Sequence, residues 1–304
     1  MSDNLAHYLV IMNTVELSRV VAWTLALGAA VACTHGAPST APTTPTPTGS
    51  WTQVWSDEFD GAANAPLDTT KWGFDKGDGC ASGICGWGND EKETYTDAPE
   101  NIALNGQGQL MIVARRAGPG LNCYYGACRY TSAKINTRGK MNAAPGRVEA
   151  RIKLSSGQGL WPAFWMLGSN FPTTPWPQCG ELDVMENHGS NVASTSSAVH
   201  GPGYSGATPF VRGFTLNSGT FADDFHVFAV EWNAVEIQFF VDNTVHYVIT
   251  RSQAEQFGKW VFDQPFFVVL NLAVGGHFDG DPASDAIFPA TMLVDYVRVY
   301  KWTP

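Results

Sequence analysis

Hydrophobic alternation with a period of two is the feature that most limits the folds open to this chain. Apolar and polar residues alternate along 147–154 and along the first positions of 236–241. Shorter β-branched and aromatic runs, at 266–270 and 292–300, are bounded by proline or glycine. Helical periodicity is nearly absent, and we expect a helical turn only at 252–257. Many short strands separated by turn residues predict an all-β protein with two packed antiparallel sheets, a sandwich or jelly roll.

The charge balance excludes several classes of partner. Lysine and arginine number 18 against 28 aspartate and glutamate, for a net charge of −10. No basic field is therefore present to attract phosphates or anionic lipid, and we expect no nucleic-acid partner. A neutral ligand such as a sugar is compatible with this balance. The 11 tryptophans indicate a surface lined with aromatic rings.

The first 33 residues have the pattern of an export signal. Arg19 precedes 13 uncharged, mostly apolar residues, 20–32, which end in Ala-Val-Ala before Cys33. A membrane span needs about 20 such residues, so we predict a signal peptide over 1–33 and no span. Cys33 itself suits a lipoprotein signal, and a buried N-terminal helix is the alternative. The protein is thus expected to be secreted, or lipid-anchored at Cys33 to the cell envelope.

A linker and one large domain follow this segment. Residues 34–50 are rich in proline and threonine and contain no large apolar side chain, so they are expected to form an extended tether. The remaining residues, 51–304, fit one β-domain, which we expect to be monomeric.

Cysteine use agrees with export. Cys80 and Cys85 enclose four residues, as do Cys123 and Cys128, and both pairs lie in glycine-rich loops. No histidine accompanies them at ligand spacing, which favours disulfides over a metal site, although spacing alone does not settle the connectivity. We interpret Cys179 as a buried thiol in an apolar strand.

The segment 176–187 carries three carboxylates close together. In a regular strand Glu181 and Asp183 point to one face and Glu186 to the other. A β-bulge around Val184 and Met185 would bring Glu186 to the face of the other two. Such crowding disfavours common ionisation and is costly unless function requires it. A solvated acidic strand or a set of calcium ligands is the alternative interpretation.

Retaining glycoside hydrolysis uses this kind of crowding. It needs two carboxyl groups about 5 to 5.5 Å apart, one ionised as nucleophile and one protonated as acid. A neighbouring negative charge raises the pKa of the acid and retains its proton near neutral pH. We therefore assign Glu181 as nucleophile, Glu186 as general acid and then base, and Asp183 as the partner that hydrogen-bonds Glu181.

The same segment resembles the E-x-D-x-x-E signature of glycoside hydrolase family 16, in the bulged form typical of laminarinases. Further similarity lies at 55–59, 146–151, 160–167, 271–276 and 295–300, in family order. The resemblance implies a β-jelly roll with a concave sugar-binding cleft and a retaining mechanism that needs no cofactor for catalysis. It also implies the same roles for Glu181, Asp183 and Glu186.

The resemblance further implies a set of substrate-binding residues. Flat indole rings stack on pyranose faces, and polar groups hold sugar hydroxyls. The implied set is Asn89, Glu91, Lys134, Trp161, Trp165, Trp176, His200 and Asn271. Trp165 is equally compatible with the core, and Asn89 and Glu91 are compatible with a surface loop. Lys134 stands where arginine is common, so a bidentate contact becomes a single ammonium. His277 and Phe278 replace a more polar residue and a tryptophan, so subsite length is expected to differ.

A structural calcium ion is also implied, because Glu58 and Asp295 match residues that meet on the convex face in the family. Oxygen ligands from separate strands suit Ca²⁺, and ordinary surface carboxylates are the alternative.

The leading hypothesis is a secreted endo-β-1,3-glucanase whose partner is a β-glucan. The alternatives are a family member acting on mixed-linkage β-glucan or galactan, and a non-catalytic carbohydrate-binding jelly-roll module. Three retained carboxyls speak against the last, since binding alone gains nothing from them.

Overall fold

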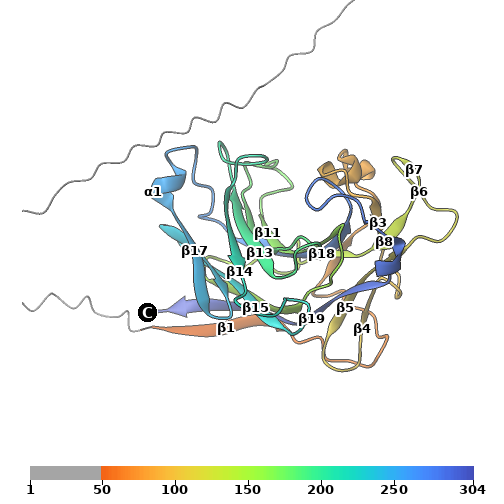
Figure 1. Ribbon diagram of the computed structural model, residues 1–304. Coiled ribbons are helices and arrows are strands. Elements are labelled where there is room, and N and C mark those ends of the chain that lie inside the picture. Colours follow the sequence, from red (N-terminus) through yellow and green to blue (C-terminus); the bar gives the residue numbers. More distant parts are fainter. Residues whose placement is uncertain (1–48) are drawn as a thin grey trace, which may run out of the picture. The chain divides into compact units, whose positions relative to one another are not determined.

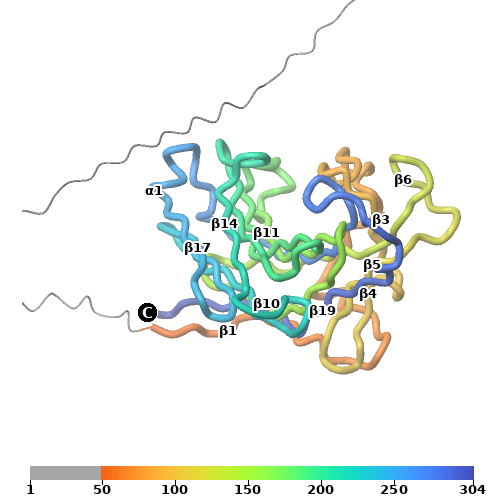
Figure 2. The backbone as a smooth tube through the Cα atoms, viewed as in Figure 1, coloured from red at the N-terminus to blue at the C-terminus, as the bar shows by residue number. Residues whose placement is uncertain are grey.

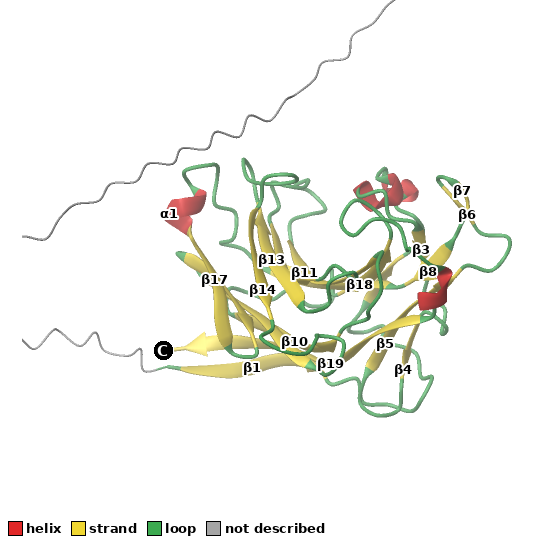
Figure 3. Ribbon diagram, viewed as in Figure 1, coloured by secondary structure: helices red, strands yellow, loops and turns green. Residues whose placement is uncertain are grey.

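The computed structural model describes residues 49–304, and strands dominate this part of the chain (Figure 1). The predicted signal peptide, Cys33 and all but the last two residues of the predicted linker lie outside the described residues. The described residues include no helix with the length and apolar character needed to cross a membrane. Figure 3 shows how little helix accompanies the strands: one turn, α1 (Arg251–Ala254), and the short 3-10 helices η1 (Cys80–Ser82), η2 (Cys85–Gly88) and η3 (Asp285–Ile287).

Two large sheets form the fold. The larger has ten strands, with β1 and β4 pairing to β19 and β5 beside the path β17-β16-β15-β10-β19-β5-β8-β3. Its members are β1 (Ser50–Asp57), β3 (Glu93–Tyr95), β4 (Ile102–Leu104), β5 (Leu110–Arg116), β8 (Tyr130–Ser132), β10 (Arg147–Lys153), β15 (His226–Trp232), β16 (Glu236–Val241), β17 (Thr244–Thr250) and β19 (Ala290–Thr303).

The second sheet has seven strands in the order β14-β13-β12-β11-β18-β9-β2. Its members are β2 (Gly73–Asp75), β9 (Lys134–Asn136), β11 (Leu160–Gly168), β12 (Glu181–Glu186), β13 (Ser194–His200), β14 (Phe210–Thr215) and β18 (Phe266–Val274). A hairpin of β6 (Asn122–Cys123) and β7 (Gly126–Ala127) stands apart. All named pairings are antiparallel except that of β3 with β8, which is parallel.

The predicted strands are confirmed. The alternating run 147–154 forms β10, and 236–241 forms β16. The runs at 266–270 and 292–300 are parts of the longer strands β18 and β19. The helical turn is shorter than predicted and begins one residue earlier, at Arg251, because Thr250 and Gln253 form a capping box there.

The core lies between the two sheets and draws mainly on alternate residues of the long strands. In β10, Val148, Ala150 and Ile152 are fully buried in this core. In the seven-stranded sheet Phe164 and Leu182 point into it, which leaves the other face of β11 and β12 for polar and aromatic side chains. The two ends of the domain meet where β1 pairs with β19, as the tube in Figure 2 shows.

Both expected disulfides are present, Cys80–Cys85 and Cys123–Cys128. They brace two neighbouring loops that contact each other through Tyr124, whose hydroxyl donates to Asp90 at 2.6 Å. Gly86 makes this contact feasible, because a Cβ there would lie 3.1 Å from the Tyr124 ring and its φ is +60°. Cys179 is a free, buried thiol as predicted, but it precedes β12 instead of lying in a strand.

Candidate active site

A β-bulge in β12 brings the three carboxylates of 181–186 to one face of the sheet. Against β11, Trp165 pairs with Asp183 and Phe164 with Met185, so Val184 is the extra residue. The register with β13 also shifts between Asp183 and Glu186. Leu182, Val184 and Met185 are buried in the core, whereas Glu181 and Glu186 are partly exposed. The predicted bulge is confirmed.

His200 lies beside two of these carboxylates. It pairs with Glu181 across β12 and β13, and its Nε2 is 3.1 Å from Asp183 Oδ2 and 3.8 Å from Glu181 Oε1. Ligand atoms of Glu181, Asp183 and His200 lie within 4.8 Å of one another. Such a set has the residue types and spacing to hold a metal ion, but it equally suits proton chemistry between carboxyls.

Burial raises the pKa of every carboxyl in the cluster, and the charge of Asp183 adds to this effect on Glu181 and Glu186. Burial, then the charge of Asp183, raises the pKa of Glu181 well above its usual value, while His200 and Lys134 act in the opposite direction. Burial raises the pKa of Asp183 to about 8. Burial and Asp183 together raise the pKa of Glu186 to about 8. At neutral pH this face therefore retains protons, as the sequence argument requires for a general acid.

Trp161 contacts Glu186 directly. Its indole Nε1–H donates to Glu186 Oε1 at 3.0 Å, and its ring stacks on Phe278 with centroids 4.6 Å apart and planes at 14°. Phe278 in turn stacks on His188 at 3.8 Å. The two flat faces of Phe278 are thus occupied by protein rings, so this ring supports Trp161 and offers no free face for a sugar.

A chain of hydrogen bonds joins the polar residues on the side of β11 that pairs with β18. Trp165 Nε1–H donates to Asn271 Oδ1 at 2.7 Å, and Asn271 Nδ2 donates to the Tyr95 hydroxyl at 3.2 Å. Tyr95 donates to Glu91 at 3.0 Å, and Asn89 donates to the other oxygen of Glu91, also at 3.0 Å. The network fixes Asn271 and Glu91, both buried, in single orientations.

Lys134 occupies an aromatic cage beside this network. Its Nζ lies 4.1 Å from the ring centre of Trp87, 4.9 Å from that of Trp165 and 5.8 Å from that of Tyr95. The side chain is buried, and its charge acts on Glu181. Cation–π attraction to desolvated rings stabilises such an ammonium by about 2 kcal/mol.

Trp176 is the most exposed of the predicted aromatics, at 40%. It lies in the loop before β12, with its ring centre 6.0 Å from that of His200. The structure therefore places the predicted residues in three groups. His200 and Trp176 lie with Glu181, and Trp161 lies with Glu186. The third group joins Lys134 of β9, Trp165 of β11 and Asn271 of β18 to Glu91 and Asn89, which lie between η2 and β3.

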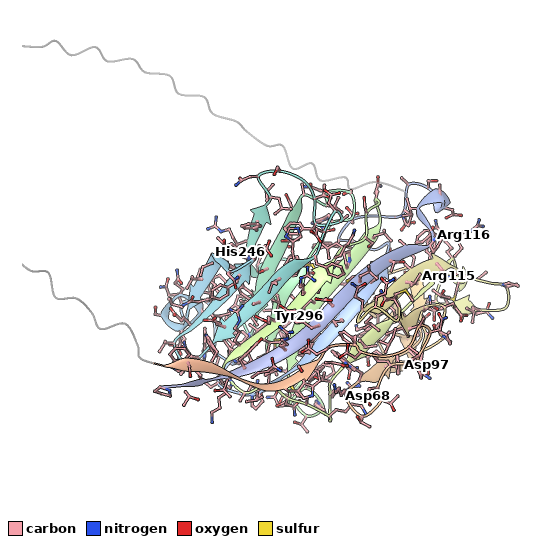
Figure 4. All side chains as sticks on the ribbon, turned by 90° about the horizontal axis from the view of Figure 1, so that it is seen from below. Asp68, Asp97, Arg115, Arg116, His246 and Tyr296 are labelled. Carbon is pink, nitrogen blue, oxygen red and sulfur yellow. A yellow bond between two sulfur atoms is a disulfide. The ribbon has the colours of Figure 1, made fainter. Side chains whose placement is uncertain are left out.

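The two residues implied as calcium ligands are each held by an arginine. Glu58 receives two hydrogen bonds from Arg298, at 3.0 and 2.8 Å, and this pairing lowers the pKa of Glu58. Asp295 is 2.8 Å from Arg151. Tyr296, on the outer face of the larger sheet (Figure 4), lies under the Arg298 guanidinium. Two guanidinium groups at these carboxylates do not fit a cation site.

Three residues of the site are missing from the sequence-based set. Trp87 and Tyr95 complete the cage around Lys134, and Phe278 covers Trp161. Alternation marks Tyr95 only as a strand residue, and Trp87 has a left-handed backbone, with φ 53°, in an irregular loop. Positions in loops carry no periodic signal, although the proximity of Trp87 to Asn89 was available as a hint.

Comparisons with known proteins agree with this arrangement. The sequence profile described as glycosyl hydrolases family 16 matches residues 89–298. A β-glucanase of Rhodothermus marinus is 41% identical over 260 residues, covering 83% of this chain and 86% of the relative. The solved structure of an endo-β-1,3-glucanase from Pyrococcus furiosus is 45% identical, with a TM-score of 0.77, covering 83% of this chain and 95% of that one. The laminarinase catalytic domain of Thermotoga maritima is 43% identical, with a TM-score of 0.77 and coverage of 83% and 98%.

Proposed function

The chain belongs to glycosyl hydrolase family 16, and we propose that it cleaves internal β-1,3 linkages of a laminarin-type glucan with retention of configuration. The observation that carries this proposal is the β12 bulge, which sets Glu181, Asp183 and Glu186 on one face beside His200 and Trp161. The family fold and the β-1,3-glucanases among the similar proteins support the substrate class.

The reaction proceeds by two displacements at the anomeric carbon. A carboxylate oxygen of Glu181 attacks this carbon while Glu186 gives its proton to the departing glycosidic oxygen, which leaves a covalent glycosyl-enzyme. Glu186, now ionised, takes a proton from water, and the water oxygen displaces Glu181. Each step inverts the carbon once, so the product keeps the β configuration. No cofactor takes part.

The protonation states follow from the surroundings of each group. With its pKa raised to about 8, Glu186 carries a proton at neutral pH and acts as the acid. Asp183, whose pKa is also raised to about 8, keeps its proton at neutral pH beside His200. Lys134 and His200 favour the ionised form of Glu181, the form that attacks the anomeric carbon, and they oppose burial and the charge of Asp183, which raise its pKa.

The rest of the face binds sugar. Exposed Trp176 offers an indole ring to a pyranose, whereas Lys134 and Asn271 supply polar atoms already fixed by their neighbours. Mixed-linkage glucan and galactan remain the alternative substrates. Parallel digestion of laminarin, lichenan and agarose, with product sizing, separates them: the proposal expects short oligosaccharides from laminarin first, and exclusive digestion of agarose overturns it.

The carboxylate roles are tested by two variants. Glu181→Ala should abolish laminarin hydrolysis with its fold intact by circular dichroism, and full activity would contradict the assignment. Glu186→Ala, assayed on a dinitrophenyl β-glucoside oligomer, should regain turnover with azide and release the β-glycosyl azide. An α product would contradict the acid/base role of Glu186, because azide would then have displaced the leaving group directly, with no covalent glycosyl-enzyme. A binding module without catalysis would show no reducing ends from laminarin with the wild-type protein.

We also propose that the protein is exported and works as a monomer outside the cytoplasm. Two disulfides in a domain of this size support an oxidising compartment. Lipidation at Cys33 stays a prediction, which mass spectrometry of the mature protein tests. The implied calcium ion does not fit Glu58 and Asp295, because each is paired with an arginine. A melting temperature unchanged by a chelator is the result expected from the arginine-paired Glu58 and Asp295.

A further inference from the structure

Ser197 faces the bulge of β12 from the neighbouring strand. The pairing of β12 with β13 passes from Asp183 opposite Ala198 to Glu186 opposite Ser196, so Ser197 has no pairing residue in β12. Its side chain is 1% exposed and lies on the core side of β13, the side that also carries the fully buried Val199. A polar group in this position needs a hydrogen-bond partner.

Its partners are the bulged residue and the opposite sheet. Ser197 Oγ–H donates to the carbonyl oxygen of Val184 at 2.8 Å. Ser197 Oγ also lies 3.1 Å from Nε2 of His246. His246 belongs to the edge strand β17 of the ten-stranded sheet (Figure 4). The contact therefore crosses the core, from the extra residue of the catalytic strand to the other layer of the sandwich.

The directions of these hydrogen bonds are fixed by proton count. Ser197 has one hydroxyl proton, and Val184 O can only accept it, so Ser197 must accept from His246 Nε2–H. Nδ1 of His246 is buried and has no partner among the described residues, and a charged ring with an unpaired N–H there would be costly, so the ring is neutral. Burial and the charge of Arg212 lower the pKa of His246 to about 4, which agrees with a neutral ring. Phe214 covers the ring edgewise, with centroids 5.6 Å apart.

Val184 needs this serine because it is the bulged residue. In regular pairing its carbonyl would take a ladder hydrogen bond or meet solvent, but it is 1% exposed and opposite the gap in the β13 register. A buried carbonyl without a donor costs about 1–3 kcal/mol. That cost would act against the bulge itself, and the bulge is what turns Glu186 to the face of Glu181.

We propose that Ser197, supported by His246, is a positioning residue that holds the Val184 bulge and thereby aims Glu186 at the scissile bond. The inference rests on the proposed function, because it assigns Ser197 an effect on the general acid. Ser197 itself touches neither substrate nor reacting atoms.

The test compares two leaving groups in Ser197→Ala. Laminarin has an alcohol leaving group that needs the Glu186 proton, whereas dinitrophenolate from a dinitrophenyl β-laminaribioside leaves without one. We expect kcat on laminarin to fall about tenfold or more, with KM unchanged and the first-turnover burst of dinitrophenolate within about twofold of wild type. Ser155→Ala is the matched control, because Ser155 is also buried and its Oγ has no partner among the described residues.

Further variants keep the test decisive. Ser197→Thr keeps the hydroxyl and should restore most of the laminarin rate. His246→Ala should show a smaller loss of the same selective kind, and the double variant should lose less than the sum of the two. If Ser197→Ala does not fold, His246→Ala is assayed in its place and must show the selective loss.

The outcomes separate the two claims. A selective loss on laminarin in Ser197→Ala, absent in Ser155→Ala, supports the inference. Wild-type kcat in Ser197→Ala, or an equal loss on both substrates, overturns it while leaving the proposed function standing. Wild-type protein inactive on both substrates overturns the proposed function and, with it, the inference.

Discussion

Trp161→Phe isolates the effect of one hydrogen bond on the general acid. The indole Nε1–H lies 3.0 Å from Glu186 Oε1 and lowers the pKa of that carboxyl against the larger raising effect of burial. Phenylalanine removes the donor and keeps an aromatic ring against Phe278. The substitution therefore changes the acidity of Glu186 more than the packing around it.

The expected shift follows from the charge on the acceptor. A hydrogen bond to a charged group contributes about 1.5–3 kcal/mol and one to a neutral group about 0.5–1.5 kcal/mol, so the ionised form of Glu186 gains about 1 kcal/mol more. One pKa unit corresponds to about 1.4 kcal/mol. Losing the donor should raise the pKa of Glu186 from about 8 by about 0.7 unit. Activity at high pH then persists to a higher pH than in wild type.

The assay is the pH dependence of kcat/KM on soluble laminarin, whose alkaline limb reports the acid of the free enzyme. Trp165→Phe is the matched control, because its indole donates to the neutral amide of Asn271 and to no carboxylate. The control should leave the alkaline limb in place. An unmoved or lowered limb in Trp161→Phe, or an equal shift in both variants, would refute the reasoning.

Three other predictions follow from the same surroundings. The folded-state pKa of Glu186 is raised to about 8 from 4.5, so its contribution to stability is full below about pH 4.5 and lost as the pH rises through 8. The free energy of unfolding of the wild type should therefore decline with rising pH by an amount on the order of a few kcal/mol, and Glu186→Gln should flatten this decline in thermal melts. Parallel curves for the two proteins would contradict the prediction. Lys134→Met removes a cation that favours ionised Glu181, so the acidic limb of the pH dependence of kcat/KM should move to higher pH. Lys134→Arg keeps the charge and should leave the limb in place. Identical acidic limbs in the wild type and both variants would exclude this role. Replacing Cys123 and Cys128 by serine loosens the hairpin that holds Tyr124 against Asp90, and steady-state kinetics should show KM for laminarin rising a few-fold with kcat nearly constant; a fall in kcat alone would argue against it.

Strand prediction succeeds here because alternation is a local signal. The runs at β10 and β16 show a buried face by alternation. The runs at β18 and β19 are marked by β-branched and aromatic residues between turn residues. The bulge is also visible, since the odd spacing between Asp183 and Glu186 places three carboxylates on one face only if one residue is extra. Residues in irregular loops, such as Trp87, carry no such pattern.

Local sequence patterns do not reveal contacts between segments that are distant in the sequence. Nothing in the spacing shows that Phe278 stacks between Trp161 and His188, or that Lys134 lies among rings from three separate segments. The pairing of Glu58 with Arg298 joins residues 240 positions apart, and it takes up the carboxylate that the resemblance assigned to calcium.

The sequence by itself determined which residues alternate, where the chain turns and which strand carries the acidic groups, because these depend on side chains a few positions apart. Only the tertiary structure decided what surrounds those acids. Their proton affinities depend on burial, on charges brought from β9 and β13 and on an indole hydrogen bond from β11. The serine that bonds the bulge is in turn contacted by a histidine from the opposite sheet. Desolvation and contact across a core arise only when the two sheets pack together.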